Sequence, residues 1–119
     1  MTSITVTFDA FDVVVVPFPF TDRSSIKRRP ALVISSASAF GLETGHSVLA
    51  MITSAKNSDW LLDTPIQDLT AAGLPSPSVV RMKLFTLNNQ LVLRKAGALL
   101  GPDRSAVVAS LQRLLGLGA

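Results

Sequence analysis

Short apolar runs of strand length alternate with polar segments along the first half of the chain. Asp12–Phe18 contains four consecutive valines, whose β-branched side chains lose rotamer freedom in a helix but pack well in a sheet. Residues 31–34 and 47–53 are further apolar runs of similar length, and Pro30 suits the opening position of the first of them. The pattern therefore predicts three strands, with a polar loop that turns basic at residues 27–29 between the first two.

The second half of the chain is more interrupted. Residues 54–77 carry several prolines, asparagine and glycine, which predict long loops with one helical turn around residues 68–72. An apolar run at residues 78–84 predicts a fourth strand. After a turn at Asn88 and Asn89, residues 91–93 are expected to resume the sheet.

From Gly101 the apolar residues recur at helical spacing. Pro102 suits a first helical position and Gly116 a stop. About five short strands and one terminal helix predict a mainly β fold with α additions, namely a small antiparallel barrel in a single domain over residues 1–119. The residues expected on the apolar face of the helix are Val107, Val108, Leu111, Leu114 and Leu115.

Composition adds expectations about partners and location. Apolar residues make up 48% of the chain and charged residues only 16%, against roughly 25% in typical soluble proteins, so part of the surface should be apolar and a homodimer is expected. Cysteine is absent, which excludes disulfides, thiolate catalysis and cysteine-bound zinc and fits the cytoplasm. The first residues lack a basic signal-peptide region and the longest apolar run is too short to span a bilayer, so no membrane association is expected.

The residue inventory also narrows the chemistry. His46 is the only histidine, and no nucleotide-binding glycine pattern occurs, so neither a metal nor a cofactor is expected. The net charge of +3 is a modest excess that a polyanionic ligand would match. Arginines near polar loops suit a reaction in which negative charge develops on phosphate oxygens.

Four cations gather in the segment before the second strand. A phosphate-binding site and a loop kept basic for solubility explain them about equally well. Arg29 differs from the others by its position at the strand edge, where its guanidinium can make paired hydrogen bonds to a phosphate. The four residues are Arg23, Lys27, Arg28 and Arg29.

Three further positions carry candidate chemistry. Thr53 ends the third strand with a hydroxyl that can donate to a phosphoryl oxygen, although β propensity alone also explains a threonine there. Arg81 and Lys83 lie two apart in a strand and so share one face, either as a cationic pair for RNA or as an exposed basic surface. Trp60 can stack on a base or pack in a core or dimer contact. Ser54 and Lys56, which follow the third strand, complete the candidate RNA contacts.

The order of these segments resembles a known family. Residues 12–20 (DVVVVPFPF) followed by residues 27–34 (KRRPALVI) are similar to the opening of the PemK/MazF-like toxins of type II toxin–antitoxin systems. Residues 50–54 resemble the third strand of that family and residues 78–81 its next strand. Residues 97–99 and the terminal helix resemble its close, so the similarity covers nearly the whole chain.

The resemblance implies a fold, an activity and partners. The fold would be a CcdB-like, SH3-like barrel that dimerises. The activity would be sequence-specific, metal-independent cleavage of single-stranded mRNA, restrained by a cognate antitoxin whose tail lies in the RNA groove. By position, Arg29 would match the catalytic arginine of the family's Arg-Pro motif, Thr53 its catalytic threonine, and Arg81 an arginine that some members use in cleavage.

One departure from the family affects the mechanism. Some members carry an acidic residue where this chain has Lys83, which cannot act as a carboxylate base. Attack by a ribose 2′-hydroxyl needs a proton acceptor, and Asp22, His46 or a water are the candidates. Two alternatives stay open: a non-catalytic barrel that binds RNA or a protein partner, and a CcdB-like gyrase poison.

Overall fold

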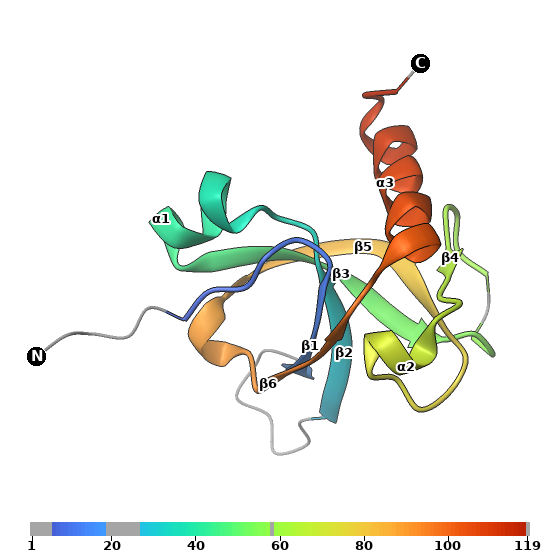
Figure 1. The fold of residues 1–119 in the computed structure, drawn as a ribbon, viewed down its shortest axis with the longest axis horizontal. Coiled ribbons are helices and arrows are strands. Elements are labelled where there is room, and N and C mark those ends of the chain that lie inside the picture. Colours follow the sequence, from blue (N-terminus) through green and yellow to red (C-terminus); the bar gives the residue numbers. More distant parts are fainter. Residues whose placement is uncertain (1–5, 19–26, 58, 119) are drawn as a thin grey trace, which may run out of the picture.

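The computed structural model describes residues 6–18, 27–57 and 59–118, and contains a curled, fully antiparallel sheet (Figure 1). The strand order is β4-β5-β3-β2-β1-β6, which leaves β4 and β6 at the edges. This half-barrel with a C-terminal helix confirms the predicted fold class. The strands are β1 (Asp12–Phe18), β2 (Lys27–Val33), β3 (His46–Ser54), β4 (Thr64–Pro65), β5 (Ser78–Asn88) and β6 (Arg94–Ala98).

Two strand predictions were wrong in their boundaries. β2 begins at Lys27, so the basic residues 27–29 belong to the strand and not to a loop. The ladder between β2 and β3 covers only Ala31 to Val33, so the earlier half of β2 pairs with β1 alone. Pro30 is tolerated there because the β3-facing edge of that half needs no N–H donor.

The strand expected at residues 91–93 is also displaced. Leu91 ends a short helical turn, η2 (Asn89–Leu91). Asn88 caps the start of this turn, since its side chain accepts a hydrogen bond from Gln90 N at 2.9 Å. Ladder pairing with β1 begins at Arg94, although Leu93 N already donates a hydrogen bond to the carbonyl of Val15 at 2.9 Å. The ladder carries a register shift between Val13 and Val14 of β1. An apolar run of three residues was therefore not itself the strand.

The predicted helical turn is present as α2 (Leu69–Ala72), and Asp68 caps it by accepting a hydrogen bond from Ala71 N at 3.0 Å. The backbone of α2 packs directly on the backbone of β6. A Cβ added at Gly97 would collide with the carbonyls of Ala71 and Ala72, so only glycine fits there.

The segment after β2 forms η1 (Ala37–Gly41) and α1 (Leu42–Thr44), which the sequence did not predict.

The terminal helix α3 (Gly101–Leu115) has the predicted start and stop, with Gly116 at φ 68° after its last turn. Only part of its predicted apolar face is covered. Val107 is 1% exposed, whereas Leu114 is 40% and Leu115 57% exposed. The C-terminal end of the helix points away from the sheet (Figure 1), so its last apolar residues have no core to enter.

Alternation along the strands divides the interior into two clusters. Val13, Leu32 and Ile52 belong to the cluster covered by α3, while their neighbours point to the other face. The second cluster fills that other face at the His46 end of β3 and gives way to polar side chains toward Thr53. Its buried members are Val14, Val16, Ala31, Val33, Leu49 and Leu87.

Candidate functional site

An irregularity in the sheet shapes the candidate site. β3 and β5 pair in regular register up to Ala50 opposite Leu84, and the next pair is Met51 opposite Arg81. Two residues of β5, Met82 and Lys83, are therefore inserted without partners on β3. Bulges bend a strand and redirect side chains, and they occur often beside functional sites. Here the bulge lies next to the end of β3 that carries Thr53.

A hollow of about 390 Å³ opens beside this bulge. Its walls are largely apolar, but one hydroxyl and two cationic side chains enter it, from Thr53, Arg81 and Lys83. The structure thus brings together three of the residues singled out in the sequence. The full lining is Phe18, Met51, Thr53, Arg81, Lys83, Leu84 and Phe85.

Arg29 lies on the same face of the sheet, next to the hollow but outside its lining. It is directly opposite Val16 on β1, and Ala31, two residues further along β2, is opposite Met51. Extending that register places Arg29 across from Thr53 on the same face. The Arg29 side chain is exposed, so it can reach a ligand that occupies the hollow.

The other candidate RNA contacts are only partly gathered at this site. Lys27, opposite Phe18, shares the face of Arg29, but Arg28 alternates to the opposite face. Ser54 likewise alternates away from Thr53, and Lys56 is exposed in the turn after β3. Arg23 and Asp22 lie outside the described residues.

Asp63 is a member of the site that sequence reasoning missed. Its carboxylate accepts hydrogen bonds from Arg81 Nε at 3.1 Å and from Arg81 Nη2 at 2.8 Å, a two-point ion pair. The two side chains are only 11% and 17% exposed for Arg81 and Asp63 respectively. These bonds hold the pKa of Asp63 below its usual value and raise the pKa of Arg81. Asp63 therefore stays ionised near neutral pH and is a weak proton acceptor.

A tight turn presents both Asp63 and Trp60 to this edge of β5. Asp63 N donates to the carbonyl of Trp60, and Trp60 N donates to Asp63 Oδ2, each at 3.1 Å. Leu62 adopts φ 68°, a left-handed conformation that costs a residue with a side chain about 1–2 kcal/mol. Strained backbone of this kind gathers at functional sites. Beyond the turn, Lys83 Nζ lies 4.3 Å from the centroid of the Trp60 ring.

The Thr53 hydroxyl has a defined orientation. Asn57 Nδ2 donates a hydrogen bond to Thr53 Oγ1, which leaves the hydroxyl hydrogen to point elsewhere. Thr53 lines the hollow, so an anion bound there can accept that hydrogen. The Thr53 hydroxyl can therefore donate to an anion in the hollow.

His46 cannot serve this site. It begins β3, whereas Thr53 stands near the other end of that strand, roughly 20 Å away along the strand. Its Nδ1 lies 2.9 Å from the carbonyl oxygen of Thr44, in the adjoining turn. Within one chain, His46 is therefore too far from this site to act as its base. Within residues 6–18, 27–57 and 59–118, no group of three or more His, Asp or Glu side chains could hold a metal ion.

Membrane insertion through a helix finds no support in the described part of the chain, where none of the helices is long and apolar enough to cross a bilayer.

Comparison with known proteins relates this geometry to a family. The sequence profile of the PemK-like, MazF-like toxins of type II toxin–antitoxin systems matches residues 9–115. No curated protein sequence matches significantly. A chain from the crystal structure of MazE-MazF of Deinococcus radiodurans is 23% identical with a TM-score of 0.74, over 94% of this chain and 99% of that one.

Two further solved structures have the same fold at lower identity. The Mycobacterium tuberculosis toxin MazF-mt6 is 19% identical with a TM-score of 0.70, over 91% of this chain and 99% of that one. A chain from a mycobacterial endoribonuclease in complex with its cognate antitoxin is 14% identical with a TM-score of 0.71, over 95% of this chain and 97% of that one.

Proposed function

The chain belongs to the PemK-like, MazF-like toxins of type II toxin–antitoxin systems, and we propose that it is a metal-independent endoribonuclease that cleaves single-stranded mRNA at specific sequences in the cytoplasm. One observation carries the proposal. Thr53 of β3 and Arg81 and Lys83 of β5 line a single hollow, and Arg29 of β2 stands on the same face beside it. A hydroxyl donor among guanidinium and ammonium groups is suited to a phosphodiester whose oxygens gain charge.

The reaction follows from the chemistry of RNA. The ribose 2′-oxygen attacks the adjacent phosphorus, the bond from phosphorus to the 5′-oxygen breaks, and the products are a 2′,3′-cyclic phosphate and a 5′-hydroxyl. The attacking hydroxyl loses a proton and the leaving oxygen gains one. In this scheme Arg29 and Arg81 stabilise the extra charge on the phosphorane, and Thr53 donates to one of its oxygens.

Asp63 acts in this scheme by orienting Arg81. Because it is held as a carboxylate by two hydrogen bonds from the guanidinium, it is a poor base but a firm anchor. The planar group of Arg81 is thereby fixed before the substrate arrives, which lowers the entropy lost on binding. A water molecule or Asp22 takes the proton from the 2′-hydroxyl in this scheme.

The partners proposed are a cognate antitoxin and a second copy of the chain. Family membership and the antitoxin complex among the similar structures support the first. Exposed apolar residues at the end of α3 and just beyond it support the second, since Leu115 is 57% and Leu117 75% exposed.

Incubation with a long single-stranded RNA in excess EDTA tests the proposal. Cleavage with 5′-hydroxyl ends at a recurring sequence is the expected result. A second candidate is a non-catalytic RNA-binding barrel, which the pairing of Arg81 with Asp63 and the lysine at position 83 favour. RNA that is bound but left intact would support that candidate and refute the endoribonuclease.

A further inference from the structure

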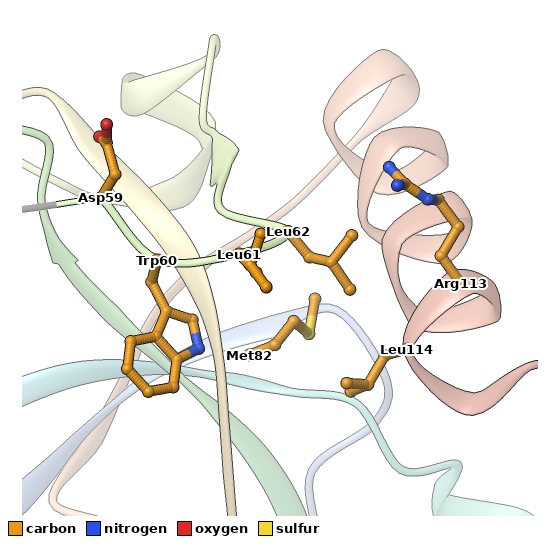
Figure 2. Close-up of a pocket in the computed structure, with 7 residues that line it drawn as sticks. All are labelled: Asp59, Trp60, Leu61, Leu62, Met82, Arg113 and Leu114. Carbon is orange, nitrogen blue, oxygen red and sulfur yellow. The ribbon is translucent and has the colours of Figure 1, made fainter.

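We propose that Trp60 and the apolar pocket beside it hold one unstacked base of the RNA strand whose phosphate lies in the hollow. This inference rests on the proposed function and adds a base-binding subsite to it. The pocket has a volume of about 710 Å³ and opens between the turn at residues 60–63, the bulge of β5 and the end of α3 (Figure 2). Its lining residues are Asp59, Trp60, Leu61, Leu62, Met82, Arg113 and Leu114.

The pocket and the phosphate site adjoin at the bulge, on the two faces of β5. Met82 lines the pocket and the next residue, Lys83, lines the hollow. Trp60 joins the two, since its ring forms one wall of the pocket and also lies 4.3 Å from Lys83 Nζ. A nucleotide whose phosphate is held at Arg81 and Lys83 therefore has an aromatic surface next to it.

The walls of the pocket have the composition that a base needs. In Figure 2 the indole of Trp60 stands on one side, Leu114 of α3 faces it from the other, and Met82 lies between them. The flat indole of Trp60 can stack on a base, and Asp59 and Arg113 at the margin provide an acceptor and donors for the edge of that base.

Charge and exposure favour RNA over an apolar partner as the occupant. Trp60 is the only tryptophan in the chain and is 47% exposed, so it does not act as a core residue. Cations stand on both sides of it, Lys83 over its ring and Arg113 across the pocket. Proteins that bind single strands combine aromatic stacking with a cationic path for the backbone, which is this arrangement.

The turn fixes the backbone of Trp60 beside the phosphate site. Its backbone N–H is bonded to the Asp63 carboxylate that also holds Arg81. The stacking residue and the phosphate-binding residue are therefore fixed to one another through Asp63. That connection predicts that the subsite sets the position of a base relative to the cut, and hence sequence preference.

The single tryptophan makes the test direct. The probe is a short 2′-O-methyl oligonucleotide copied from the site at which the protein cuts its RNA substrate, which cannot be cleaved because the attacking hydroxyl is blocked. Stacking on Trp60 should quench the intrinsic fluorescence as the probe is added. By anisotropy of the labelled probe, Trp60→Ala should weaken binding roughly tenfold to a hundredfold, whereas Trp60→Phe should retain most of the affinity.

Leu91→Ala is the matched control, because Leu91 is 50% exposed and lines neither the hollow nor the pocket. It should bind as the wild type does. The subsite is refuted if the wild type cuts RNA but its fluorescence does not change when the probe is added, or if Trp60→Ala binds the probe as the wild type does. The proposed endoribonuclease activity is not affected by either result. Emission that changes with protein concentration and not with the probe would place a second copy in the pocket and also refute it. A wild type that cuts no RNA would refute the proposed function itself.

Discussion

Asp63 accepts two hydrogen bonds from Arg81, at 3.1 Å from Nε and 2.8 Å from Nη2, and so fixes the guanidinium at the wall of the hollow. The pair links a loop residue to the bulge of β5. It also neutralises part of the positive charge at the site, so net attraction for a phosphate depends on Lys83 and Arg29.

Asp63→Asn should lower the free energy of unfolding by about 1–2 kcal/mol near pH 7, because hydrogen bonds to a charged, largely buried partner are lost. The pKa of Asp63 is lowered in the folded protein. The contribution of ionised Asp63 to the free energy of unfolding is therefore fully present above the usual pKa of 3.8 and is lost as the pH falls through the lowered pKa. Urea denaturation near pH 7 and near pH 3 measures the difference, which should shrink at the lower pH.

Glu43→Gln is the control for this experiment, because Glu43 is exposed in α1 and lies outside the site. It should change stability little at either pH. An Asp63→Asn penalty that is equally large near pH 3, or absent near pH 7, would contradict the role assigned to the ion pair.

Thr53→Ala should reduce the rate of RNA cleavage on the order of a hundredfold, the usual effect of removing one oriented donor to a developing anion. Thr53→Ser should retain most of the rate because it keeps the hydroxyl. Single-turnover cleavage of a labelled RNA measures both variants. Thr86→Ala, an exposed threonine elsewhere on β5, should cleave normally. Equal rates for the Thr53→Ala and Thr86→Ala variants would remove Thr53 from the site.

The chain should be a homodimer at micromolar concentration. The reason is its exposed apolar surface, in which Leu115 is 57% and Leu117 75% exposed in the single chain. Sedimentation equilibrium measures the mass, and twice the mass of one chain is expected. A mass equal to one chain at that concentration would refute the prediction.

The sequence predicted those parts of the fold that neighbouring residues specify. The valines of β1 and the proline and glycine that bound α3 act locally, so their pattern was sufficient. The start of β2 was misplaced because pairing with β1 overrides the preference of basic residues for a loop. The end of α3 was expected to be covered, but periodicity alone does not reveal how far a helix follows its sheet.

The residue types of the candidate site could be predicted from the sequence, but the ion pair and the strand register that arrange them could not. Thr53, Arg81 and Lys83 stood out by charge, hydroxyl chemistry and family resemblance, and the hollow contains all three. Asp63 gave no such signal, because a lone aspartate in a loop does not indicate which arginine it will reach. The bulge depends on register between β3 and β5, which side-chain pattern does not fix to a single residue.

Arg29 provides the most direct measurement of the central claim, because its side chain is exposed and its replacement should spare the fold. Arg94→Ala is the matched control, since Arg94 is an exposed arginine on β6 at the other edge of the sheet. Arg104 is a less suitable control, because its Cζ lies 4.4 Å from the centroid of the Phe11 ring.

The measurement is the single-turnover rate of RNA cleavage in EDTA for the wild type, Arg29→Ala, Arg29→Lys and Arg94→Ala, with folding checked by circular dichroism. Arg29→Ala should lose roughly a hundredfold or more. Arg29→Lys should recover little, because an ammonium cannot make the planar two-point contact with phosphate. Arg94→Ala should cleave at the wild-type rate. Equal rates for folded Arg29→Ala and Arg94→Ala would contradict the assignment of this face as the catalytic site.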